Sequence, residues 1–115
     1  MKLYDQANVL AKAIKECKEY RDVVEAGKEL KKDEKTKQMV KEFLILQAEL
    51  AYAQSMGGKE DKQKVDRLND MSVLIKNNAQ AQSYLQKYRA WQTIAGEVFQ
   101  IIQNAMAEGM SILDK

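Results

Sequence analysis

The stretch WQTIAGEVFQIIQNAM, residues 91–106, decides the fold because it is apolar around most of a helix. Nine of its sixteen residues are Trp, Ile, Val, Phe, Met or Ala, and Glu97 is its single charge in a chain that is 31% charged. A helix with so wide an apolar face is normally covered on most sides. A 115-residue chain offers few elements to cover it. We therefore expect the surplus face to contact another subunit, and the alternative is the central core helix of a monomer.

The apolar pattern of this stretch belongs to one long helix. Apolar residues recur at alternating intervals of four and three, as one face of a helix requires: Tyr84, Tyr88, Trp91, Ala95, Val98, Ile102 and Ala105. Leu85, Ile94, Phe99, Ile101 and Met106 widen this stripe. Five residues are predicted to form a seam between the core and the interface: Trp91, Val98, Phe99, Ile102 and Met106.

The rest of the chain also predicts helices. Pro is absent, Gly occurs five times, and the helix formers Ala, Lys, Glu, Gln, Leu and Met are plentiful. We predict an all-α fold with a single domain over residues 1–115, a long-helix hairpin or bundle of four to five helices that oligomerises through its C-terminal helix. The expected helices span 5–17, 19–32, 34–56, 60–76 and 79–112, with a bend near residues 18–20.

Polar residues and glycines predict where the helices begin and end. Asp33 and Asn78 are expected N-caps, because their side chains can accept bonds from the first free backbone amides. Gly57 and Gly58 are expected to supply left-handed geometry that ends a helix, and Glu60 and Asp61 to open the next one. Asp5 is a further expected cap at the start of the first helix.

The sequence offers little to an enzyme. It contains no histidine, which removes the commonest general base and metal ligand. Cys17 is the only cysteine, and its phase with Leu10 and Ile14 favours a small buried hydrophobe over a reactive thiol. Glu97 lies on a polar strip, where we expect it to be exposed or in a polar contact. We therefore predict no catalytic residue, no cofactor and no metal.

A run of lysines suggests a second function, nucleic-acid association. Lys28, Lys31, Lys32 and Lys35 form a candidate basic surface that extends to Lys41. Phosphate binding needs lysines on one surface without competing acids, and base stacking needs aromatic residues. Acidic residues are interleaved here and aromatic residues are not, so a solvated helix face is the favoured interpretation. Direct nucleic-acid binding stays the alternative function.

The chain shows neither a secretion signal nor a membrane span. Its start, MKLYDQAN, lacks the apolar run of a signal peptide, and no stretch reaches about 18 uninterrupted apolar residues. We expect a cytoplasmic protein without membrane contact.

Three segments together resemble the YlbF/YmcA-like family (Com_YlbF, including YheA-like members), small helical proteins of Gram-positive bacteria. They are ANVLAKAIKECKEY at 7–20, LKKDEKTKQMVKEFLILQAEL at 30–50 and NNAQAQSYLQKYRAWQTIAGEVFQII at 77–102. Two departures are visible. The family typically places Pro after the two helix starts, where this chain has Glu34 and Ala79, and some members carry a cysteine cluster associated with an iron–sulfur complex.

The resemblance implies a helical, oligomerising protein without enzymatic activity. Its family members are linked to competence, sporulation and biofilm regulation, and some act in a complex that modulates an RNA-processing endonuclease. It therefore implies a regulatory adaptor that forms a homo-oligomer, a dimer or larger, and binds protein partners of an RNA-processing complex. No catalytic residue carries over, and Cys17 alone does not match the cysteine cluster.

Overall fold

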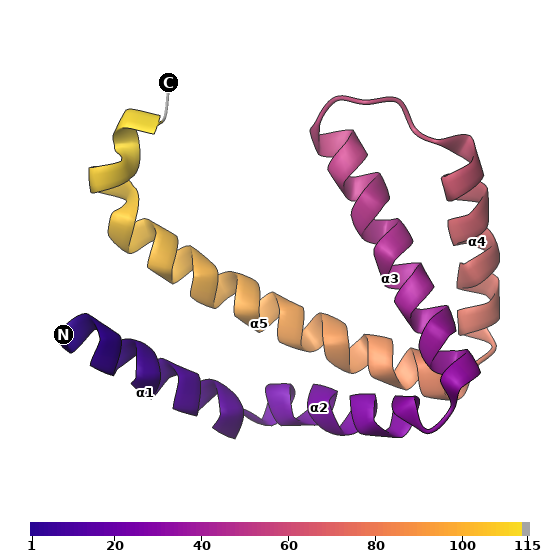
Figure 1. The fold of residues 1–115 in the computed structure, drawn as a ribbon, viewed down its shortest axis with the longest axis horizontal. Helices are drawn as coiled ribbons and strands as arrows, with labels where there is room; N and C mark the ends of the chain where they lie inside the picture. The colour runs from indigo at the N-terminus through magenta and orange to yellow at the C-terminus, as the bar shows by residue number, and fades with distance from the viewer. Residues whose placement is uncertain (114–115) are drawn as a thin grey trace.

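The computed structural model describes residues 1–113 and contains five α-helices and no strand within that range (Figure 1). The all-α prediction is confirmed. The helices are α1 (Lys2–Glu16), α2 (Lys18–Lys31), α3 (Glu34–Ser55), α4 (Lys62–Lys76) and α5 (Ala79–Met110), and a short 3-10 turn follows at Ser111–Leu113.

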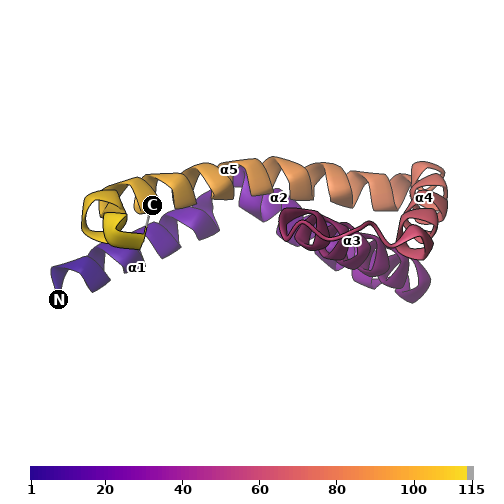
Figure 2. The ribbon, with the colours of Figure 1, turned by 90° about the horizontal axis from the view of Figure 1, so that it is seen from above.

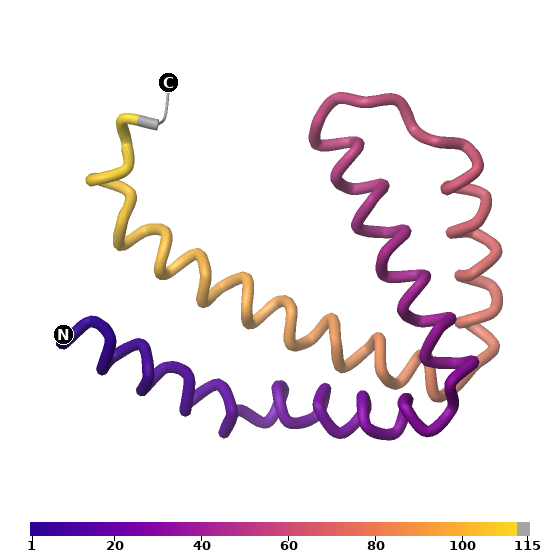
Figure 3. Tube along the Cα trace, viewed as in Figure 1, coloured from indigo at the N-terminus to yellow at the C-terminus, as the bar shows by residue number. Residues whose placement is uncertain are grey.

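The molecule is open, with a helical head and two arms. The head is formed by the α3–α4 hairpin, by α2 and by the first half of α5, while α1 and the second half of α5 extend away from it (Figures 1 and 3). Viewed from above, the fold is thin, and its extents are 47 × 38 × 17 Å (Figure 2). Its radius of gyration is 17.9 Å, against about 13 Å for a compact domain of this length.

The hydrophobic core lies in the head. Its buried residues come from α2, α3, α4 and the start of α5: Leu30, Val40, Phe43, Leu46, Met71, Ile75, Ala81 and Leu85. The helices predicted over residues 34–56 and 60–76 supply most of them. The second half of α5 contributes none of these core residues, so the core stabilises the head and leaves the arms without cover.

The α3–α4 hairpin ends α3 with a Schellman motif. The amide of Gly58 donates to the Ala53 carbonyl at 2.9 Å, and the amide of Gly57 donates to Gln54 at 3.1 Å. Only Gly57 has a positive φ, +73°, so the prediction that both glycines supply left-handed geometry is wrong for Gly58. Across the hairpin, ion pairs join Arg67 to Glu42 and Lys64 to Glu49.

The helix starts correct some of the predicted bounds. Asp33 caps α3 and Asn78 caps α5, as predicted. Helix α1 begins at Lys2 with no side-chain cap, so Asp5 lies inside its first turn. Helix α4 begins at Lys62 because the Asp61 side chain accepts from the amides of residues 63 and 64, which leaves Glu60 outside the helix. The break between α1 and α2 falls at Cys17 rather than at residues 18–20.

One buried hydroxyl joins the two confirmed caps. Thr36 is only 3% exposed, and its Oγ1 donates to Asp33 Oδ2 at 2.9 Å. The same oxygen accepts a bond from Asn78 Nδ2 at 3.3 Å. The hydrogen bond from Thr36 contributes most to holding the pKa of the Asp33 carboxyl below its usual value. The starts of α3 and α5 are therefore fixed to each other by polar contacts at the edge of the core.

Thr36→Val is expected to lower the free energy of unfolding by about 1 kcal/mol, because valine keeps the shape and removes the bonding oxygen. The measurement is the urea midpoint at fixed protein concentration. The control is Thr93→Val, the chain's other threonine, which lies exposed on α5 and bonds only to the carbonyl of residue 89. Equal midpoints for the two variants would contradict a structural role for the Thr36 contacts.

Candidate association surface

The second half of α5 carries a continuous run of exposed apolar side chains. Each would normally be covered, yet each is 41–69% exposed: Phe99, Ile101, Ile102, Met106 and Met110. We call the four that share one side of the helix the distal face of α5: Phe99, Ile102, Met106 and Met110. Ile101 projects from the opposite side. Ile112, in the turn that follows, is 89% exposed. Large contiguous apolar patches on a surface usually mark interaction sites.

The predicted seam residues divide into two groups. Trp91 and Val98 are half-buried, and the Trp91 ring packs edge-to-face on Tyr20 of α2 with ring centroids 5.1 Å apart. Phe99, Ile102 and Met106 are exposed. The seam residues near Trp91 are therefore partly covered by other residues of the same chain, whereas those beyond Val98 are exposed to solvent. The alternative of a central core helix is wrong for this second half of α5.

Charge on the distal part of α5 is sparse and of one sign. Between residues 94 and 110 the only charged side chains are Glu97 and Glu108. Glu97 is exposed, as expected from its place on the polar strip. On a helical wheel both carboxylates lie opposite the distal face, so that face is apolar without a charged edge and suits an apolar partner.

Helix α1 presents a second exposed apolar surface, which was not predicted to be an interface. Leu3, Tyr4 and Val9 are 62–68% exposed, and Leu10 is 36% exposed. Within the described residues, α1 contributes no buried side chain. The 4,3,4 spacing of Leu3, Ala7, Leu10 and Ile14 was the available signal, but spacing does not say what covers a stripe.

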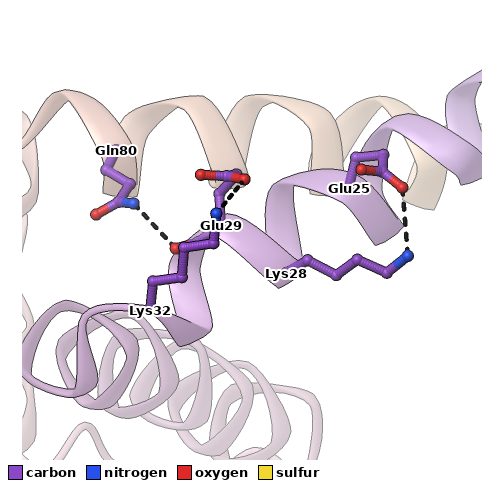
Figure 4. Close-up of polar contacts among 5 residues, drawn as sticks. All are labelled: Glu25, Lys28, Glu29, Lys32 and Gln80. Carbon is purple, nitrogen blue, oxygen red and sulfur yellow. Dashed lines mark hydrogen bonds and ion pairs between the residues drawn. The ribbon is translucent and has the colours of Figure 1, made fainter.

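The candidate basic surface is partly neutralised in place. Lys28 Nζ lies 3.4 Å from Glu25 Oε1, and Lys32 Nζ lies 3.0 Å from Glu29 Oε1 (Figure 4). Gln80 Nε2 donates to the Glu29 carbonyl oxygen at 3.0 Å and joins the start of α5 to this end of α2. Lys31 and Lys35 form no ion pair within residues 1–113.

Cys17 does not occupy the buried helical position expected for it. It lies half-buried at the break between α1 and α2, with ψ of 130°, and its Sγ donates to Glu19 Oε1 at 3.3 Å. The break takes Cys17 out of phase with the stripe of α1, which explains the wrong prediction. Across the described part of the chain, no group of three or more His, Cys, Asp or Glu residues could hold a metal ion. None of the described helices is long and apolar enough to cross a membrane.

The chain is a small all-α protein with a helical head and two open arms, and its prominent feature is exposed apolar surface. The sequence profile of the family described as "Control of competence regulator ComK, YlbF/YmcA" matches residues 3–107. The chain therefore belongs to the Com_YlbF family, and the resemblance drawn from its helices is confirmed.

Relatives of the chain agree in length and carry no assigned activity in their names. The chain is 28% identical to a UPF0342 protein from Clostridium tetani, over 100% of this chain and 99% of the relative. It is 32% identical to a UPF0342 protein from Caldicellulosiruptor saccharolyticus, over 90% of this chain and 87% of the relative.

Two solved structures share the fold. A DUF964 protein of unknown function from Bacillus stearothermophilus superposes with a TM-score of 0.71 at 18% identity, covering 94% of this chain and 95% of that one. Bacillus subtilis RicA in complex with RicF gives a TM-score of 0.58 at 18% identity, with 94% and 96% covered. At these identities the likeness shows the fold alone.

Proposed function

We propose that this chain is a non-enzymatic regulatory protein that acts by protein–protein association and forms a homo-oligomer through the distal face of α5. The observation that carries the proposal is the excess of exposed surface. The chain exposes 9298 Å², whereas a compact monomer of its mass, 13.2 kDa, exposes about 6,400 Å². The excess is therefore roughly 2,900 Å², most of which would be covered in a compact protein of this size.

Two copies together have an excess of about 5,800 Å², at the upper end of what a large obligate interface covers. Obligate homodimers bury about 2,000–5,000 Å² in total, and their interfaces resemble a domain core cut in half. The distal face of α5 has that composition, with Phe, Ile and Met side chains exposed side by side. Each Å² of apolar surface that association removes from water lowers the free energy by about 25 cal/mol, which favours the assembled state.

The regulatory part of the proposal rests on the family. Its description names control of a competence regulator, and one structure with this fold is a complex of two different proteins, RicA and RicF. We therefore place the chain among adaptors of competence, sporulation or biofilm regulation, or of an RNA-processing complex. In that role the arms hold the copies together and surfaces of the head remain free for a protein partner.

Sedimentation equilibrium of the purified protein over a wide concentration range tests the proposed self-association. A dimer or larger assembly is expected at micromolar concentration, with a mass that falls on dilution if dissociation is reached. A monomer at every concentration would overturn the homo-oligomer, and a search for a different protein partner would replace it.

The alternative function, nucleic-acid association, predicts a different result. If Lys31 and Lys35 contact phosphates, binding to a labelled RNA or DNA oligonucleotide falls steeply with added salt. We expect no such binding, because Lys28 and Lys32 are already paired with acids. Salt-sensitive binding that Lys31→Glu weakens, and that Lys62→Glu on α4 leaves unchanged, would establish the alternative instead.

A further inference from the structure

Helix α1 is a helix without support in the single chain. It has 15 residues, and among the described residues it packs only against α2, the element that follows it. Isolated helices shorter than about 12–15 residues are marginal in water, and most helical stability in proteins comes from packing of an apolar face. Because α1 has no buried side chain, something outside the single chain must cover it if it is to remain helical.

The apolar stripe of α1 matches the distal face of α5 in length. The stripe runs from Leu3 to Ile14 and the distal face from Phe99 to Met110, so each spans about 18 Å at 1.5 Å per residue. Both surfaces are made of large aliphatic or aromatic side chains. Helices of equal length with apolar stripes can pack along their whole extent and leave neither stripe exposed.

The stripe of α1 and the distal face of α5 can meet without bringing like charges together. On a helical wheel Lys2 and Lys15 flank the stripe of α1, while Asp5 and Glu16 lie on the far side. On the same wheel Glu97 and Glu108 lie on the side of distal α5 opposite its apolar face, so that face carries no charge at its edge. Packing α1 on the distal face therefore sets no like charges against each other, and unlike the pairing of two distal faces it also covers α1.

The chain does not bring its own α1 onto its own distal α5. No Cα atom of α1 lies within 8 Å of a Cα atom of α5. Helix α2 packs along the first half of α5, whereas α1, beyond the break at Cys17, runs beside the second half of α5 without contacting it (Figures 1 and 2). Both apolar surfaces are therefore available to a second molecule at once.

We infer that the occupant of the distal face of α5 is α1 of a second copy of this chain, and that the two copies exchange these arms reciprocally. The inference rests on the proposed self-association and specifies its geometry. Such an exchange is isologous: the same pair of surfaces meets twice around a two-fold axis, so the assembly closes as a dimer. It covers both unsupported arms of each chain with the same contact.

Site-specific cross-linking between two differently tagged chains tests the exchange. Both chains carry Cys17→Ser, which removes the only native thiol. One chain also carries Leu10→Cys on α1, and the other carries Ile102→Cys on α5. After the chains are mixed under conditions that allow subunit exchange, a short bis-maleimide is added. We expect the mixed cross-linked dimer to exceed either same-tag product several-fold.

The matched control moves the α1 cysteine to the other side of the helix. Lys12→Cys, two residues from Leu10, lies almost opposite the stripe and is expected to give little cross-linking to Ile102→Cys. A single chain with both Leu10→Cys and Ile102→Cys, diluted among unlabelled chains, measures closure within one molecule.

Each outcome separates the inference from the proposal beneath it. A mixed dimer that depends on Leu10→Cys supports the exchange. A dimeric mass by light scattering with no cross-link between α1 and α5 overturns the exchange and leaves self-association intact. A cross-link only within the doubly substituted chain means that α1 covers its own α5, which overturns the exchange. A monomeric mass without any cross-link removes both.

Discussion

Ile102→Ala is expected to weaken self-association by about three orders of magnitude. In a two-fold dimer each substitution occurs twice, because the same residue is present on both copies. Truncating a fully buried aliphatic side chain to alanine costs about 2–5 kcal/mol of stability. Ile102 is 41% exposed in the single chain, so association buries only part of its side chain. We therefore use the lower value of this range, about 2 kcal/mol for each copy. Twice about 2 kcal/mol corresponds to roughly a thousandfold change in Kd.

Sedimentation equilibrium of Ile102→Ala beside the unsubstituted protein measures this change. Val73→Ala is the control, because Val73 is an equally branched aliphatic residue, 60% exposed, on α4 of the head. That variant is expected to retain the native Kd. If Ile102→Ala and Phe99→Ala both assemble as tightly as the unsubstituted chain, the distal face of α5 is not the interface. Far-UV circular dichroism at the same concentrations confirms that the head remains folded.

Much of the fold could be predicted from the sequence because its determinants are local. The caps at Asp33 and Asn78 each require one side chain and the amides of the next turn. The glycine turn after α3 requires one residue with positive φ. The buried residues of α3 and α4 recur at helical intervals of three or four, so these faces too are encoded locally.

The residues that pack on each apolar stripe could not be predicted from the sequence in the same way. The stripes of α1 and of α5 near Trp91 look alike in sequence, yet Trp91 meets Tyr20 and α1 meets no core residue. The difference arises at Cys17, where one extended residue redirects the chain. Whether an apolar stripe is covered within the chain depends on contacts between distant residues, which periodicity does not encode.

The basic surface illustrates the same limit for charges. Four lysines between residues 28 and 35 read as a continuous patch in sequence, but the helix sets Lys28 and Lys32 beside acids three residues earlier. Such exposed pairs contribute little to stability. Their consequence is for function, since they leave Lys31 and Lys35 as the unneutralised part of the patch in the described chain.

Phe43→Ala is expected to cost the head about 3–5 kcal/mol, a large part of the stability of a small domain. Phe43 is 5% exposed and packs in the core where α3, α4 and the start of α5 meet. Urea unfolding at fixed protein concentration measures the loss, because self-association adds to the apparent stability.

The chain's other phenylalanine supplies the contrast that separates head from arm. Phe99 is 65% exposed on the distal face of α5, so Phe99→Ala removes no core contact. At concentrations where the protein is dissociated, Phe99→Ala is expected to unfold with the native midpoint, and Phe43→Ala at a much lower one. At concentrations where the protein is assembled, binding of a second chain stabilises the folded state in the same way as a bound ligand. Phe99→Ala should lose this extra stability because it weakens association. If Phe99→Ala lowers the midpoint of the dissociated chain as far as Phe43→Ala does, the arm is part of the monomer core and the division into head and arms fails.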